Sequence, residues 1–178
     1  SLLNILLHKG VLCHMITYQP KIMDLTKTRT FTAKNRTNLV TVDNLLVPGE
    51  YRPEPFDSQE FTILCEKMKE ARRNHRPVVC FFGAHVIKCG LSKYLLWFLR
   101  NGYITHLAGN GACSIHDFEL SYLGGTSEHV PTAIEDGTFG MWEETGRWMN
   151  EAIIAGASQN YGYGESLAHY IDEHPNQF

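Results

Sequence analysis

The sequence lacks several features that would assign it to a special class of protein. It has no CxxC pair, and its five cysteines are odd in number and widely spaced, so we expect no metal site and no disulfide framework. Lysine and arginine concentrate in no segment and the net charge is −3, which argues against nucleic-acid binding. The apolar start has no basic beginning, no cleavage site and no run long enough to span a membrane. These absences predict a cytoplasmic protein with no nucleic-acid or membrane partner.

The chain divides by composition into an N-terminal arm or extension, residues 1–56, and a folded part, residues 57–178. Residues 1 to about 14 are interpreted as an extension, and the rest of the arm is polar and ends in a proline cluster. Two interpretations of the arm stay open: a segment that covers the folded part at a subunit contact, and a surface loop. At 178 residues and 43% hydrophobic, the chain is large enough to bury a core without staples.

The central stretch from Pro77 to Thr126 carries the clearest pattern of secondary structure. The continuous run VVCFF, residues 78–82, predicts a strand buried on both faces of a parallel sheet. A helix over Leu91–Asn101 follows, then Gly102 as its left-handed cap, then a strand over Tyr103–Ala108. Together these elements predict a right-handed βαβ unit. Two strands are few for an open α/β sheet, so further strands are expected in residues 16–47 or in a larger unit.

A glycine turn, Gly109–Ala112, follows the second strand and precedes the next helix. Free backbone N–H groups at a helix start attract phosphate or carboxylate, so the turn is a candidate anion site. Its match to GxGxxG is partial because Ser114 takes the last position, and a tight βα turn with no ligand explains it equally well. Ser114 is expected to cap the helix, with Asp117 as its partner.

Candidate catalytic residues crowd the first turns of this helix. His116 and Glu119 are three residues apart and share one face, and Asp117 lies beside them, so an acid–base role or recognition of a cation is expected. For Asp117, a simple capping role is the stronger interpretation. Lys88 lies in the turn after the first strand and could pair with an anion, although a surface lysine is commoner.

The segment FFGAHVIKCGLSKYLLWFLRNGYITHLAGNGACSIHDFELSYLGGTSEHV resembles the deoxyhypusine synthase family, and more closely its prokaryotic deoxyhypusine-synthase-like branch. The resemblance covers roughly residues 79–167. It depends on Phe82-Gly83, Gly90-Leu91, the glycine turn, His116-Asp117 and the GGTSEHV segment taken as an ordered set.

The resemblance implies an α/β protein with a three-layer Rossmann-like parallel sheet that binds NAD, incomplete in this chain, assembled as a homotetramer. It implies transfer of the aminobutyl group of spermidine to an acceptor lysine or amine. The catalytic residues would be His116, Asp117 and Glu119. The cofactor-binding residues would be Gly83, Ala84, His85, Gly109, Asn110, Gly111, Ala112, Thr126 and Ser127.

The sequence departs from the family in two places. The Thr-Ser-Asn of authentic synthases is Ala84, His85 and Val86 here, and no segment matches the surroundings of the family's imine-forming lysine. The sequence is therefore expected to be the first half of a longer protein. Two alternatives stay open: a non-catalytic paralogue or subunit with the same fold, and a related enzyme acting on another amine or guanidine with His116 and Asp117 as its acid–base pair.

Overall fold

The computed structural model of the protein describes residues 22–50 and 52–174, so the expected extension over residues 1–14 lies outside the described part. The helices are α2 (Gln59–Arg73), α3 (His85–Lys88), α4 (Ser92–Arg100), α5 (Gly111–Leu123), α6 (Val130–Asp136), α7 (Glu143–Ser158) and α8 (Tyr163–Glu173). Short 3-10 turns are η1 (Leu25–Lys27), η2 (Ala33–Asn35) and η3 (Val42–Asn44). The strands are β1 (Val40–Thr41), β2 (Val79–Phe81), β3 (His106–Ala108) and β4 (Gly125–Thr126).

The predicted βαβ unit is confirmed. Strands β2 and β3 pair in parallel, with Val79 opposite His106 and Phe81 opposite Ala108, and α3 and α4 form the crossover between them. Gly102 ends the crossover with a φ of 68°, as its predicted role as a left-handed cap requires. The short-range glycine and β-branched signals in this stretch are therefore sufficient to place the unit.

The predicted three-layer Rossmann-like parallel sheet is wrong. In the described residues the structure is mostly helical and has two small sheets of two strands each, β2–β3 and the antiparallel pair β1–β4. Within the described range 22–47, the only strand is β1, and it joins β4 instead of extending β2–β3. Two separate ribbons cannot form the middle layer of a doubly wound fold.

Two physical reasons account for this error. The run at residues 78–82 is not covered on both faces, since Val79 is 48% exposed and Phe81 is 81% exposed. After β3 the chain also fails to return to the sheet, because α5 packs against α7 and α8. A hydrophobic run identifies β2 as a strand, but it does not show how many neighbours the strand has.

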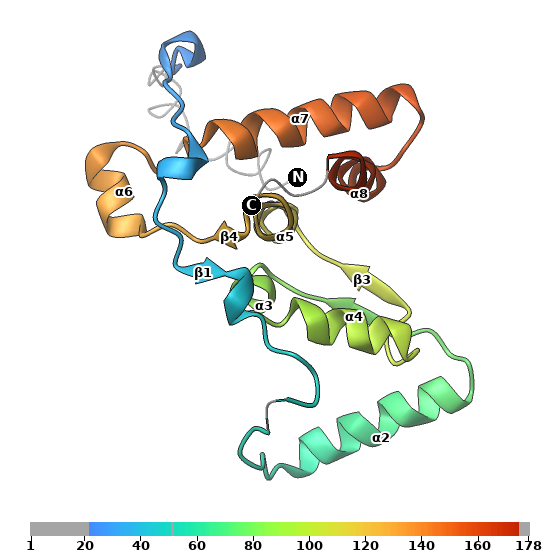
Figure 1. The fold of residues 1–178 in the computed structure, drawn as a ribbon. Helices are drawn as coiled ribbons and strands as arrows, with labels where there is room; N and C mark the ends of the chain where they lie inside the picture. Colours follow the sequence, from blue (N-terminus) through green and yellow to red (C-terminus); the bar gives the residue numbers. More distant parts are fainter. Residues whose placement is uncertain (1–21, 51, 175–178) are drawn as a thin grey trace, which may run out of the picture.

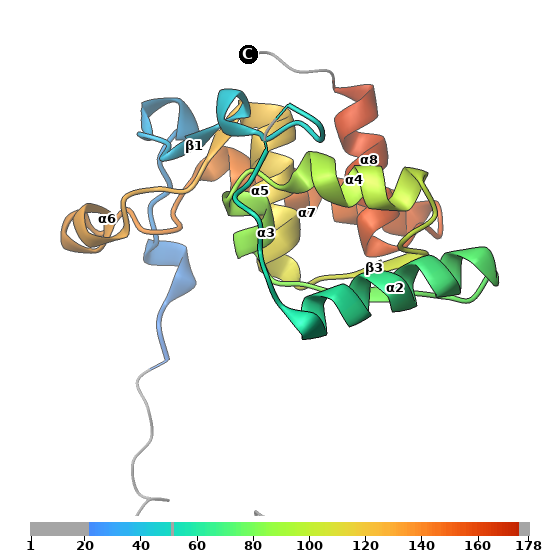
Figure 2. The same ribbon diagram turned by 90° about the horizontal axis from the view of Figure 1, so that it is seen from below.

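The core lies between α5, α7 and α8, as the upper half of Figure 1 shows. Phe118 and Tyr122 of α5 stack with ring centroids 5.6 Å apart, and they pack with Met149, Ala152 and Leu167. Helices α2 and α4, in contrast, contain no fully buried residue, and in both Figure 1 and Figure 2 α2 lies at the edge of the molecule. No helix in the described part of the chain combines the length and apolar character needed to cross a membrane.

The described part of the N-terminal arm runs along this helical core. Phe31 forms a parallel bridge with Trp142, and its backbone N–H donates to the Met141 carbonyl at 2.8 Å. Further along, the Leu39 N–H donates to the Ser127 carbonyl at 2.7 Å, next to the β1–β4 pair. Through these backbone contacts the arm reaches both the start of α7 and the segment that follows α5.

A close contact between two helices generates a stability prediction. A Cβ atom on Gly156 of α7 would lie 3.0 Å from the Cα atom of Ser166 on α8, so Gly156→Ala should destabilise the fold by about 1–3 kcal/mol through overpacking. Gly146 lies on the same helix, and a methyl group added there would have nothing within 4 Å, so Gly146→Ala should stabilise by up to about 1 kcal/mol. Urea unfolding of both variants checks this. Equal effects of the two substitutions would contradict it.

Candidate functional site

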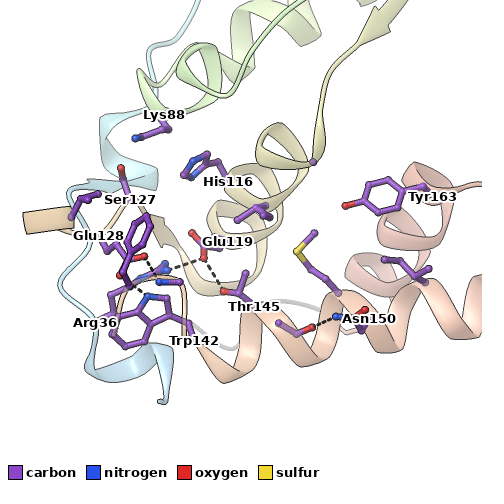
Figure 3. A pocket seen from close by; sticks show the side chains of 18 residues that line it. Arg36, Lys88, His116, Glu119, Ser127, Glu128, Trp142, Thr145, Asn150 and Tyr163 are labelled. Carbon is purple, nitrogen blue, oxygen red and sulfur yellow. Dashed lines mark hydrogen bonds and ion pairs between the residues drawn. The ribbon is translucent and has the colours of Figure 1, made fainter. Parts of the chain in front are cut away.

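A cavity of about 490 Å³ lies between α5, the start of α7 and the segment that follows β4, and Figure 3 shows it from close by. We call it the relay cavity. Its wall includes Arg36 from the N-terminal arm, His116 and Glu119 from α5, and Trp142 and Thr145 at the start of α7. Segments that are distant in sequence therefore meet at one concave surface, as binding sites commonly require.

A buried ion pair forms the floor of the relay cavity. Arg36 Nη1 donates to Glu119 Oε1 at 2.8 Å, and the two side chains are only 3% and 4% exposed. The Glu119 carboxylate also accepts from Thr145 at 2.8 Å and from Thr126 at 2.5 Å. Buried charges are tolerated only when they are paired and their remaining hydrogen-bonding groups are satisfied, and this arrangement meets both conditions.

A hydrogen-bonded chain runs from this ion pair to His116. The only hydroxyl proton of Thr126 goes to Glu119, so the Thr126 oxygen must accept from the Nδ1–H of His116, at 2.7 Å. In the neutral imidazole that arrangement assigns the free lone pair to Nε2. Nε2 has no hydrogen-bond partner among the residues that the structure describes. It is also not fully buried, so a ligand can reach it.

The environment keeps His116 neutral. Burial lowers the pKa of its imidazole below the ordinary value of 6.5, and the positive charges of Lys88 and Arg36 lower it further, against an opposing effect of Glu119. At neutral pH the ring therefore keeps an unprotonated nitrogen. An imidazole of this kind, oriented through its other nitrogen, can act as a general base.

Glu128 is a second carboxylate in the wall of the relay cavity. It accepts from the Trp142 indole N–H at 2.8 Å and from the Gly140 backbone N–H at 3.0 Å. Both donors are neutral, so they orient the carboxylate without cancelling its charge. The Arg36 guanidinium lies over the Trp142 ring, 5.5 Å from its centroid, in a cation–π contact. Trp142 therefore contacts both Glu128 and the arginine of the buried ion pair.

The glycine turn lies at a second cavity, of about 820 Å³, beyond the end of β3, and its Gly111 also borders the relay cavity. Gly109, Asn110, Gly111 and Asp117 contribute to the wall of the second cavity. The α5 helix begins at Gly111, and its cap is Asn110, whose side chain accepts from the Ala112 and Cys113 N–H groups. The predicted capping role of Ser114 is therefore wrong.

Part of the anion-binding capacity expected of this second cavity is taken up within the protein. Among the described residues its wall contains no lysine or arginine, and the Asn110 side chain already occupies two N–H groups of the turn. Gly109 is explained by packing, since a Cβ atom there would lie 3.1 Å from the Cys113 sulfur. Burial raises the pKa of the Asp117 carboxyl in the same wall, although water on the open side of this exposed residue limits the effect.

The predicted catalytic residues divide between the two cavities. His116 and Glu119 lie in the relay cavity and are joined through Thr126, whereas Asp117 faces the second cavity. Consecutive helical residues point about 100° apart, which explains the separation. Of the predicted cofactor residues, Ser127 lines the relay cavity, and Gly83, Ala84 and His85 line neither cavity.

Sequence reasoning missed several residues of the relay cavity. Arg36 lies in a polar arm with no motif around it, and nothing in the sequence indicates that it pairs with a residue 83 positions away. Trp142 and Thr145 likewise carry no local signal. The sequence favours a surface position for Lys88, but the structure places it in the cavity wall.

Comparison of the chain with models of protein families, with curated proteins and with solved structures found no match. The resemblance to the deoxyhypusine synthase family therefore stays a prediction. Within residues 22–50 and 52–174, no cluster of three His, Cys, Asp or Glu side chains could hold a metal ion.

The buried ion pair generates a second stability prediction. Arg36→Met leaves the Glu119 charge buried and unpaired, so it should cost about 3–5 kcal/mol of unfolding free energy, measured by urea denaturation. The double variant with Glu119→Gln should recover part of the loss. The control is Arg147→Met, which removes only exposed helical ion pairs and should cost less than about 1 kcal/mol. Similar losses for Arg36 and Arg147 would contradict the assignment.

Proposed function

We propose that the relay cavity binds an amine and that His116 is the general base for a reaction at its nitrogen. The observation that carries this proposal is the hydrogen-bonded chain Arg36–Glu119–Thr126–His116, which leaves Nε2 unprotonated and open to the cavity. When a neutral amine nitrogen adds to the carbon of a C=N or C=O group, a C–N bond forms, the electrons of the π bond move to the acceptor atom, and the N–H of the attacking nitrogen becomes acidic. Nε2 can then accept that proton, and the nearby Glu119 carboxylate stabilises the imidazolium that forms.

Glu128 supports the choice of an amine as substrate. Among the described residues its carboxylate forms no ion pair and accepts only from the neutral Trp142 and Gly140 donors, and it lies in the same wall as His116. A protonated amine is the simplest partner for such a group. The apolar surface of Phe139 and Met149, which also line the cavity, suits the methylene chain of an alkylamine.

The fuller activity implied by the resemblance is a deoxyhypusine-synthase-like reaction, NAD-dependent transfer of an aminobutyl group from spermidine to an acceptor lysine or amine. The base and the acidic group of the relay cavity support the polyamine part of this proposal. The described wall of the second cavity offers NAD no lysine or arginine, so no step is assigned to the cofactor. Two alternative functions remain proposals: a non-catalytic paralogue, and an enzyme that acts on another amine. A cytoplasmic location is also a proposal.

The base is tested with His116→Gln. Aminobutyl transfer from spermidine to an amine acceptor, with NAD present, is followed by mass spectrometry, and the variant should lose at least about 100-fold in rate. His129→Gln, at an exposed histidine bonded to Thr132, should keep wild-type activity. Because the pKa of His116 is lowered below its ordinary value of 6.5, the imidazole is already unprotonated at neutral pH, and wild-type activity should fall in acid as the imidazole is protonated.

Two results would count against this function. Full activity of the His116→Gln variant would exclude the residue as the base. Binding of spermidine by the wild type without any turnover would favour the non-catalytic paralogue. Calorimetry with spermidine separates these cases, because it measures binding independently of turnover. Glu128→Gln should weaken the binding of spermidine, and Glu135→Gln, on exposed α6, should not.

We also propose that copies of this chain associate, as the expected homotetramer requires. The supporting observation is that α2, β2 and α4 each leave large apolar side chains exposed: Phe61, Ile63, Leu64, Val79, Phe81, Leu96 and Trp97. Monomers rarely leave extended apolar surface open to water.

Light scattering coupled to gel filtration tests this assembly. Phe81→Glu should shift the protein from an oligomer to a smaller species, because it places a charge among the exposed apolar side chains of the small parallel sheet. Ile154→Glu is the matched control, since Ile154 is 71% exposed on α7, away from β2. A monomeric wild type, or equal behaviour of both variants, would refute the proposal.

A further inference from the structure

Ser127 is an unusual residue in the wall of the relay cavity. Its φ is 69°, in the left-handed region that side-chain-bearing residues rarely adopt, and it is only 8% exposed. Its backbone carbonyl accepts from Leu39, but its hydroxyl forms no hydrogen bond with any residue that the structure describes. The Ser127 hydroxyl oxygen is not fully buried. Because Ser127 lines the relay cavity, the exposed part of this oxygen faces the cavity.

A glycine would adopt this backbone conformation without strain, so the side chain of Ser127 has a conformational cost. Strained positions of this kind cluster at ligand sites, where the surrounding structure holds them in place. Backbone contacts on both sides hold Ser127, since Thr126 pairs with Val40 in the β1–β4 ribbon and Leu39 donates to the Ser127 carbonyl. The hydroxyl is thus fixed at the cavity wall, and no described residue takes up its hydrogen-bonding capacity.

Lys88, the last residue of α3, reaches the same cavity from the crossover between β2 and β3. It forms no ion pair with any group in residues 22–50 or 52–174, and it is half-buried. Its positive charge is close enough to act on His116, and Figure 3 shows Lys88, Ser127 and His116 facing the same part of the cavity. A half-buried ammonium and a hydroxyl, neither paired with a described residue, therefore face one space.

We propose that Lys88 and Ser127 form an oxyanion subsite that binds a carboxylate or phosphate group of the ligand. The ammonium supplies the opposite charge and up to three N–H donors, and the hydroxyl supplies a further donor at a fixed position.

This inference rests on the proposed function, because it takes the relay cavity to be the substrate site. It narrows the class of substrate that the cavity would bind. A ligand that contacts Glu128 with an amine and Lys88 with an oxyanion carries both charges, as amino acids and aminoalkyl phosphates do. A plain polyamine gives Lys88 no anion to bind, so with spermidine as the amine the anion at Lys88 comes from the acceptor. The substrate, or the acceptor that reacts with the amine, therefore carries an acidic group.

The test is binding of small anions to the full chain, followed by the NMR signal of the Lys88 ε-methylene group and by calorimetry. Acetate and inorganic phosphate are titrated separately, with chloride keeping the ionic strength constant. The wild type should bind at least one of them. Binding of acetate alone indicates a carboxylate ligand, and binding of phosphate alone indicates a phosphorylated one.

Two variants and two matched controls make this test specific. Lys88→Met and Ser127→Gly should each weaken anion binding at least tenfold, and Ser127→Gly should fold normally because glycine accepts the positive φ. The controls Lys93→Met, at an exposed lysine of α4, and Asn160→Gly, at another positive φ of 61°, should bind as the wild type does.

Failure of the wild type to bind either anion would overturn the proposal, as would unchanged binding in both Lys88→Met and Ser127→Gly. Thermal unfolding of each variant identifies any loss that comes from misfolding. Because binding is measured without turnover, this result is independent of whether His116 acts as a base.

Discussion

The ion pair between Arg36 and Glu119 is the interaction on which the rest of the site depends. Transferring both charges out of water is costly, and the cost is offset only because Thr126, Thr145 and Asn38 complete their hydrogen bonds. The same bonds fix the Thr126 hydroxyl, which in turn fixes the tautomer of His116. The orientation of the His116 ring is thus a consequence of satisfying a buried charge.

Helix α5 separates two kinds of environment. On one side, His116 and Glu119 enter a cavity whose wall also holds a second carboxylate and a lysine. On another side, Asp117 and the glycine turn face a cavity whose described wall has no lysine or arginine. The three neighbouring titratable residues therefore do not line one cavity, because the helical rotation directs them to different spaces.

The sequence is informative where a signal is local. Turn and cap chemistry acts over a few residues. The sequence therefore identifies Gly102, the apolar run before Gly83 and the helix that ends at Gly124. The number of strands in the sheet could not be predicted. It depends on whether the chain returns to the sheet after β3, and here α5 packs against α7 and α8 instead. Arg36 could not be predicted either, because its role depends on a distant partner and no periodic pattern marks it.

The separation of 83 positions between Arg36 and Glu119 has a consequence for the order in which the molecule assembles. The helices α5, α7 and α8 are close in sequence, so they can meet early with little loss of chain entropy. The N-terminal arm has its partner surface only after α5 and the start of α7 are in place. The relay cavity should thus be completed in a late folding step, and local release of the arm would disassemble it while the helical core stays intact.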